Sequence, residues 1–158
     1  MEALLAFALP ESTLTPCQAF KIASQLVLPG WLLLLILPRW VGTRWIVHAG
    51  ILPVLLGVGY LAIVGPSIAQ GNLKFSEFGS FAGVKNLFQN DWVIVAGWIH
   101  YLAFDLWTGA WEVRDAGRIG LSHFLVIPCL FLTFMLGPVG LLLYFLFRWS
   151  MKRQFAVD

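Results

Sequence analysis

Residues 91–115 are apolar enough to cross a membrane, yet they carry side chains that could do chemistry. His100, Asp105 and Glu112 all lie within this stretch. A carboxylate deep in hydrocarbon costs roughly 2.5–3.5 kcal/mol on insertion scales, so chains rarely carry one without a use for it. A positioned carboxyl group or imidazole can donate or accept a proton in a reaction. We therefore predict acid–base chemistry here, with these three residues as catalytic candidates.

Helical spacing places several of these groups together. Tyr101, Asp105 and Glu112 recur at four- and seven-residue steps, so they share one helix face. His123 stands one turn into the next apolar segment, and a short connection would make the two helices antiparallel neighbours. We therefore predict one polar pocket that contains Asp105, Glu112, Arg114 and His123, with His123 as a fourth catalytic candidate. The alternative interpretation is a polar clamp, in which Asp105 bonds to His123 or Arg114 and only fixes the packing.

An aromatic stripe runs beside the polar face of the same segment. Large rings deep in a membrane can line a groove for a long flat ligand, or they can simply fill a core. Both interpretations stay open at this stage. The predicted ligand-binding residues are Trp98, Tyr101, Phe104, Trp107 and Trp111.

The elements that must position these groups follow from the composition. Hydrophobic residues make up 59% of the 158 residues and charged residues only 11%, whereas soluble domains have about 45–50% and about 25%. The apolar residues form four long runs, and a bilayer core needs about 20 residues per helix. We predict an all-α integral membrane protein, a four-helix antiparallel bundle formed by one domain over residues 1–158. The expected spans are about 16–37, 44–64, 91–111 and 121–147.

Local patterns refine this layout. Thr15 and Gln18 have the spacing of a capping box at the start of the first span. Between the second and third spans, phenylalanines alternate with polar residues, which predicts an amphipathic segment on the membrane surface. A tight polar turn is expected over residues 112–120. Gln25 and Thr133 are predicted structural polar residues inside the bundle.

Several classes of function are disfavoured. The net charge of +2 is too small for nucleic-acid binding, and no His or Cys pair has metal-ligand spacing. We therefore expect no metal and no protein-bound cofactor. Neither a signal peptide nor a transit peptide is recognisable, so a bacterial inner membrane is the expected location. The positive-inside rule favours cytoplasmic termini by five basic residues to four.

Two motifs resemble a known family. The stretch D-L-W-x-G-x-W covers Asp105 to Trp111, and P-C-L-x-L-T-F-x-x-G-P-x-G covers Pro128 to Gly140. Together they resemble the membrane domain of the abscisic-acid-deficient-four family, whose plant members are required for making the xanthophyll neoxanthin in chloroplasts. The resemblance implies a four-span protein that acts on or near carotenoids. In plants the implied reaction converts an epoxide-bearing xanthophyll into an allene.

Three hypotheses follow. The first is a protein that binds a carotenoid and, as the resemblance implies, isomerises it by acid–base chemistry. The second is a non-catalytic subunit that packs into a larger membrane complex, such as a photosynthetic pigment–protein complex, or into a homo-oligomer. The third is a small transporter that uses Asp105 as a proton site, which would have to oligomerise because four spans are few for a pathway.

Overall fold

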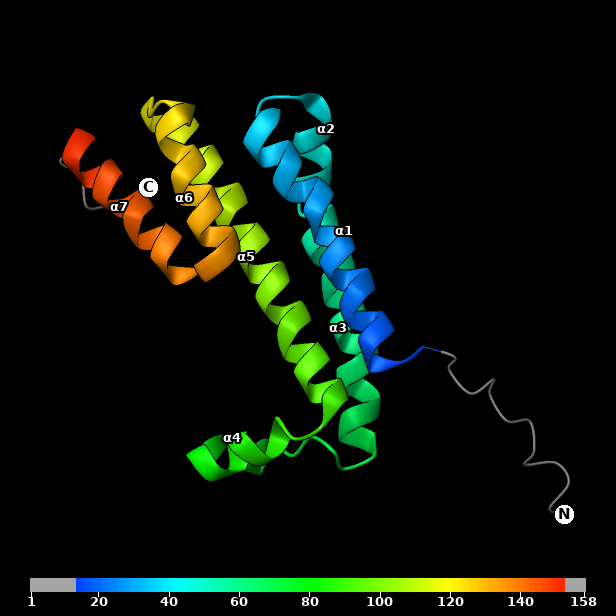
Figure 1. Ribbon diagram of the computed structural model, residues 1–158. Helices are drawn as coiled ribbons and strands as arrows, with labels where there is room; N and C mark the ends of the chain where they lie inside the picture. The colour runs from blue at the N-terminus through cyan, green and yellow to red at the C-terminus, as the bar shows by residue number, and fades with distance from the viewer. Residues whose placement is uncertain (1–13, 153–158) are drawn as a thin grey trace, which may run out of the picture.

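The computed structural model describes residues 14–152, which are helical apart from their connections and contain no strand. In chain order the elements are α1 (Pro16–Ile36), α2 (Val41–Thr43), the π-helix η1 (Arg44–His48), α3 (Ile51–Ala69), the 3₁₀ helix η2 (Phe75–Gly79), α4 (Phe81–Leu87), α5 (Asp91–Ile119), α6 (His123–Leu136) and α7 (Pro138–Lys152). Three helical segments are long and apolar enough to cross a membrane: Pro16–Ile36, Val41–Ala69 and Asp91–Ile119. The expected all-helical fold is thus confirmed for the described residues (Figure 1), and three of its segments have the length and composition of membrane spans.

The first span has the boundaries that the sequence predicts. The Thr15 hydroxyl accepts a hydrogen bond from the Gln18 amide at 3.3 Å, and the Thr15 amide donates to the Gln18 side chain at 2.8 Å. This capping box satisfies two amides that lack a partner within the helix. The helix ends at Ile36, within one residue of the expected position.

The second span is longer than predicted at both ends. It starts at Val41 and reaches α3 through a π-helical turn. The expected end at Gly65–Pro66 is wrong, because α3 continues to Ala69. A proline removes one backbone donor, and membrane helices tolerate the loss where a side chain supplies another bond. Next to Pro66, the Ser67 hydroxyl adds a hydrogen bond to the Ile63 carbonyl at 2.7 Å.

The long helix α5 lies at the centre of the fold. It packs against α1, α3 and α6, and its last turns contact α7 (Figure 1). Leu102, Leu106 and Ala110 on α5 are buried within the core. The expected turn over residues 112–120 is wrong, because α5 remains helical to Ile119 and ends where Gly120 adopts a left-handed conformation with φ of 73°.

The expected fourth span is two helices. The chain breaks at Gly137, whose φ of 45° suits glycine and few other residues. At a rise of about 1.5 Å per residue, α6 and α7 are about 21 and 22 Å long, less than the roughly 30 Å of a hydrocarbon core. In Figure 1, α7 turns back toward the level at which α6 begins. We call α6 and α7 the C-terminal hairpin; a four-helix antiparallel bundle is therefore not confirmed.

The connection between α3 and α5 lies across the other end of the molecule. It contains η2 and α4, and α4 lies across the end of the molecule at which α5 begins (Figure 1). Phe75 and Phe81 are 72% and 87% exposed. This arrangement is the one that an amphipathic segment needs if it is to rest on a membrane surface.

Candidate functional site

The polar residues that the sequence places in one pocket lie in two separate places. Asp105 and Glu112 face the C-terminal hairpin. Arg114 and His123 line a cavity between α5 and the end of α1. Each residue turns a helix by about 100°, so Arg114, two residues after Glu112, points to nearly the opposite side of α5. The predicted pocket is therefore not formed as one site.

Glu112 is sealed between α5 and α6. It has no exposed surface, and the Thr133 hydroxyl donates to its Oε1 atom at 2.9 Å. Its Oε2 atom is buried and has no hydrogen-bond partner. Thr133 thus bonds a side chain of α5, and Glu112 joins α5 to the C-terminal hairpin without access to the surface.

Asp105 lies at the tip of the C-terminal hairpin. A Cβ atom added at Gly137 would approach Asp105 Oδ1 to 3.0 Å, so the backbone of the tip rests against this carboxyl group. Next to it, the Tyr101 hydroxyl donates to the Phe134 carbonyl at 3.2 Å, near the end of α6. Its Oδ2 atom is buried and has no hydrogen-bond partner among the described residues.

A third carboxyl group continues the same face of α5, and the sequence analysis missed it. Asp115 is 1% exposed and accepts hydrogen bonds from the Tyr144 hydroxyl at 2.6 Å and from Arg148 Nε at 2.9 Å. Arg148 is only 2% exposed. The three-residue step from Glu112 to Asp115 would place both side chains on one face of a helix. This signal was not used because residues 112–120 were expected to form a turn. We call Tyr101, Asp105, Glu112 and Asp115 the carboxyl column.

His100 lies away from the carboxyl column. Its ring is exposed and packs against Phe104, with ring centroids 4.6 Å apart, and against Tyr60 of α3 at 5.9 Å. These contacts place it on the side of α5 that faces α3. The structure does not bring His100 and Asp105 together.

The five predicted ligand-binding aromatics do not form one wall. Trp98 stacks on Tyr101 with centroids 5.3 Å apart, and its indole N–H donates to the Ser24 hydroxyl of α1 at 2.9 Å. Trp107 lies under the Arg114 guanidinium, 5.4 Å from the ring centroid. Trp111 packs against Tyr144 of α7, with ring centroids 5.4 Å apart. Phe104 packs against His100. Of the five, only Tyr101 lies next to Asp105 at the hairpin tip, and Trp98 reaches that region only by stacking on Tyr101.

Gln25 is exposed on α1, and the shallow hollow beside it is lined by Leu14, Gln18, Lys21 and Ile22. It does not reach the carboxyl column, so a polar role inside the bundle is wrong for this residue.

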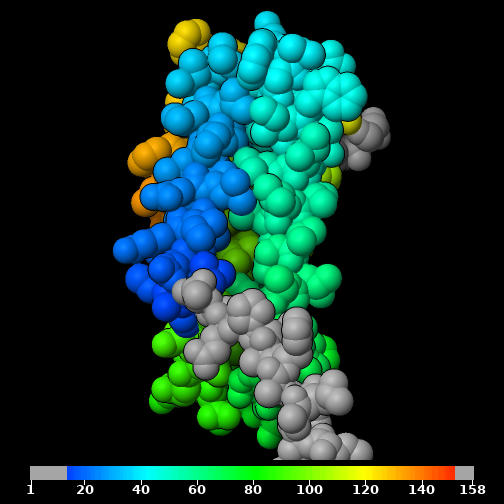
Figure 2. All heavy atoms as spheres, turned by 90° about the vertical axis from the view of Figure 1, so that its right-hand side faces the viewer, coloured from blue at the N-terminus to red at the C-terminus, as the bar shows by residue number. Residues whose placement is uncertain are grey.

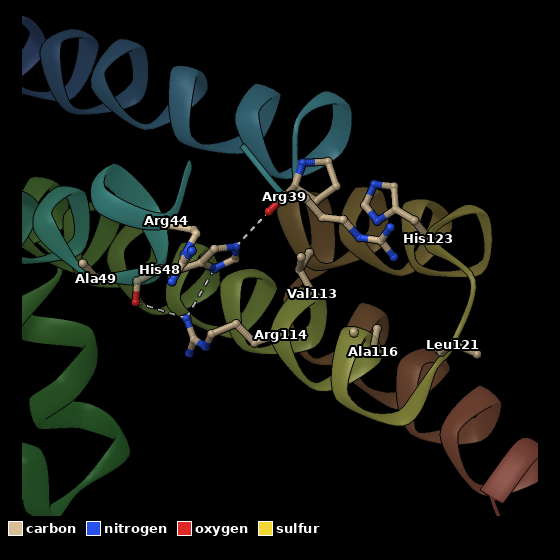
Figure 3. A pocket seen from close by; sticks show the side chains of 11 residues that line it. Arg39, Arg44, His48, Ala49, Val113, Arg114, Ala116, Leu121 and His123 are labelled. Carbon is tan, nitrogen blue, oxygen red and sulfur yellow. Dashed lines mark hydrogen bonds between the residues drawn. The ribbon is translucent and has the colours of Figure 1, made fainter. Parts of the chain in front are cut away.

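The cavity that contains Arg114 and His123 has a volume of about 520 Å³ (Figure 3). Arg39 and Arg44 reach it from the connection after α1 and from η1, and His48 lies between them and Arg114. We call it the basic pocket. Along the residues that line it there is no Asp or Glu.

Two histidines shape the basic pocket by bonding the end of α1. The last carbonyls of a helix have no partner within it. His123 Nε2 donates to the Leu35 carbonyl at 3.0 Å, and His48 Nε2 donates to the Pro38 carbonyl at 3.3 Å. Arg114 Nη1 approaches the other ring nitrogen of His48 at 3.5 Å. His123 therefore stabilises the end of α1 and does not contact the carboxyl column.

A second hollow is apolar. It has a volume of about 310 Å³ and lies between α1 and α3, with Ile99 and Trp92 of α5 among its lining residues. Figure 2 shows α1 and α3 side by side with this hollow between them. The aromatic residues that the sequence predicts for ligand binding do not line it.

Comparison with known proteins agrees with the motifs. The family model described as ABA DEFICIENT 4-like matches residues 18–144. Protein ABA DEFICIENT 4, chloroplastic, from Arabidopsis thaliana is 22% identical over 143 residues, which cover 86% of this chain and 63% of that protein. The chain thus spans less than two thirds of the length of this relative. No solved structure matches. Since the family model covers most of the sequence, the chain belongs to the ABA DEFICIENT 4-like family.

Proposed function

We propose that this membrane protein binds a xanthophyll at the tip of the C-terminal hairpin and isomerises it with Asp105 as the acid. Membership of the ABA DEFICIENT 4-like family supports the class of ligand. The observation that carries the proposal is the Oδ2 atom of Asp105, which is buried without a hydrogen-bond partner close to Tyr101, the ring on which Trp98 stacks. The two rings offer a surface for the end ring of the pigment, while its polyene chain extends into the bilayer.

The proposed reaction needs no redox partner. Opening an epoxide to an allene is an isomerisation, in which one proton enters at the epoxide oxygen and one leaves a carbon of the polyene chain. Burial away from water and away from cations favours the neutral form of a carboxyl group, so Asp105 is suited to donate the first proton. The proton released from carbon restores the carboxyl group, and the atoms balance over one cycle.

The other catalytic candidates receive different roles in this proposal. Glu112 has no exposed surface, so we assign it to the contact between α5 and α6. His123 bonds the end of α1, and His100 lies on the α3 side of α5. Among these candidates, Asp105 alone combines a free carboxyl oxygen with neighbouring rings.

Replacing Asp105 by asparagine is expected to abolish conversion while pigment binding remains. The amide keeps the size and polarity of the carboxyl group but cannot deliver a proton, and general acid catalysis contributes about 10²- to 10⁴-fold. Conversion of an epoxide-bearing xanthophyll in nanodiscs, followed by chromatography, measures the loss, and the pigment absorption band reports binding.

The matched control is Glu112→Gln, the same change on the same helix face. It keeps the bond from Thr133 and is expected to leave conversion within about three-fold of wild type. A folded Asp105→Asn variant that converts pigment at the wild-type rate would rule out Asp105 as the acid.

We also propose that the chain crosses the membrane three times and that the C-terminal hairpin enters and leaves on one side. The start of α1 and the end of α7 then lie on opposite sides (Figure 1). Among the described residues, Arg39, Arg44, Arg114, Arg118 and Arg148 lie toward the end of α5. Lys21, Lys74 and Lys85 lie toward its start. The excess of basic residues makes the arginine side the cytoplasmic one.

Reporter fusions test this topology. A fluorescent protein, active only in the cytoplasm, is expected to fluoresce at the C-terminus of the chain and to stay dark at the N-terminus. Alkaline phosphatase, active only outside, is expected to give the reverse pattern. Two termini on the same side would contradict the three-span arrangement and restore the four-span one.

A second candidate function rests on α3. An added Cβ atom at Gly57, Gly59 or Gly65 would meet nothing within 4 Å, so this helix presents small residues to an unoccupied surface. Small residues let membrane helices approach closely. This favours a non-catalytic subunit of a larger complex or of a homo-oligomer. A colourless wild-type protein that leaves native membranes only as part of a larger assembly supports this candidate over the enzyme.

A further inference from the structure

The basic pocket concentrates positive charge where no acidic side chain balances it. Arg39, Arg44 and Arg114 come from three different elements and border one cavity of about 520 Å³ (Figure 3). Within the described chain, the ion pairs of Asp115 are with Arg118 and Arg148, which are not among the lining residues. Like charges that border one cavity repel one another, and an anion bound in the cavity offsets this repulsion.

We propose that the basic pocket binds the phosphate group of an anionic membrane phospholipid. The planar guanidinium group offers paired N–H donors that match phosphate oxygens. Three guanidinium groups around one cavity offer a phosphate more N–H donors than a single arginine on the surface does. This site is separate from Asp105, and the proposal does not depend on xanthophyll chemistry.

The surroundings of the pocket favour a lipid over a soluble phosphate. The pocket lies at the ends of α1 and α5, two helices that are long enough to cross a membrane. Beside it, Trp40 and Trp45 are 49% and 66% exposed, and exposed tryptophans are typical of the headgroup level. Basic pockets between membrane helices commonly hold anionic headgroups. A soluble anion would gain nothing from exposed tryptophans such as Trp40 and Trp45 beside its site.

The pocket is also held in shape before any ligand binds. His48 and His123 fix it to the carbonyls at the end of α1, and Arg114 is stacked on Trp107. Arg39 and Arg44 are exposed and are not part of the core. Both can therefore be replaced without disturbing the helices, which makes them the right pair to test.

The test compares lipid retention by native mass spectrometry after purification from nanodiscs. The nanodiscs contain either phosphatidylcholine alone or phosphatidylcholine with phosphatidylglycerol. Each basic side chain near an anionic surface changes binding by about five-fold. The double variant Arg39→Gln and Arg44→Gln is therefore expected to weaken phosphatidylglycerol binding by about 25-fold.

The matched control is Lys74→Gln with Lys85→Gln, which removes the same charge from exposed sites at the other end of α5. It is expected to change phosphatidylglycerol binding by less than about two-fold, because those lysines lie outside the pocket. Equal losses in the two double variants would overturn the proposal, since they would show a general effect of charge. The proposal also fails if inorganic phosphate, added to protein in phosphatidylcholine nanodiscs, binds as tightly as phosphatidylglycerol and with the same dependence on the two arginines.

Discussion

Replacing Asp115 by asparagine is expected to lower the free energy of unfolding by about 3–5 kcal/mol, the cost of breaking a buried ion pair. Asparagine can still accept the hydrogen bond from Tyr144. It removes the negative charge that faces Arg148 Nε at 2.9 Å, where Arg148 is 2% exposed. The positive charge then remains buried without its counter-ion. Denaturation in mixed detergent micelles measures the loss.

Two companion variants interpret this result. Asp91→Asn makes the same change at an exposed site in the first turn of α5 and is expected to cost about 0.3–1 kcal/mol, the effect of a helix dipole. Adding Arg148→Met to Asp115→Asn removes both charges and is expected to recover at least half of the loss. If Asp115→Asn unfolds at the wild-type denaturant concentration, the buried pair does not hold the C-terminal hairpin in place.

Replacing Gly140 by alanine is expected to cost about 3 kcal/mol and to open the C-terminal hairpin. An added Cβ atom would overlap the backbone nitrogen and the hydroxyl of Thr133 and would press on the Cys129 carbonyl. The clash is with backbone, which cannot move aside as a flexible side chain can, so the cost lies at the upper end of the range for overpacked cores. Because Thr133 also bonds Glu112, displacement of α7 disturbs the carboxyl column.

The same substitution on α3 provides the comparison. At Gly57 the added methyl group meets nothing within 4 Å, and alanine favours helix over glycine by about 1 kcal/mol. Gly57→Ala is therefore expected to keep or slightly raise stability. Accessibility of Cys129, which is buried in the native fold, to a small maleimide reports whether the hairpin has opened. Labelling of Cys129 that is equally slow in both variants would contradict the predicted opening at Gly140.

The sequence predicts those parts of the fold that depend on local patterns. The start of α1 follows from Thr15 and Gln18. The start of α5 at Asp91 matches the expected start of the third span, and the structure adds a cap there, the Asn90 side chain, which accepts from the amides of Trp92 and Val93. The continuation of α5 beyond Trp111 is not local. The polar residues after Trp111 are typical of a turn when only their neighbours in the sequence are considered. They fit a buried helix because Thr133 and Tyr144, which are distant in the sequence, bond Glu112 and Asp115.

At Gly137 the sequence pattern fails in the opposite way: a continuous helix is expected, and the chain breaks. Residues 121–147 are uniformly apolar, so hydropathy alone predicts one span. Gly–Pro pairs occur inside membrane helices as well as at their ends, and Gly65–Pro66 lies within a helix in this same chain. At Gly137, by contrast, the Tyr101 hydroxyl of α5 donates to the Phe134 carbonyl near the end of α6, and the Asp105 side chain lies against the glycine.

The candidate site is divided for the same reason. Helical spacing correctly predicts that Tyr101, Asp105 and Glu112 share a face. It cannot predict which neighbouring helix covers that face, and the expected partner His123 bonds α1 instead. The basic pocket combines residues from three separate elements, so no single motif in the sequence indicates it.

The C-terminal hairpin also sets an order for assembly during synthesis. Neither α6 nor α7 is long enough to be inserted across a bilayer as an independent span. The hairpin tip carries backbone groups that need partners on α5 within the membrane, such as the Phe134 carbonyl, which accepts from the Tyr101 hydroxyl. We therefore expect α1, α3 and α5 to insert first and α6 and α7 to fold into the membrane afterwards. Arg148 then reaches Asp115 from the side on which it was made, and its charge never has to be translocated.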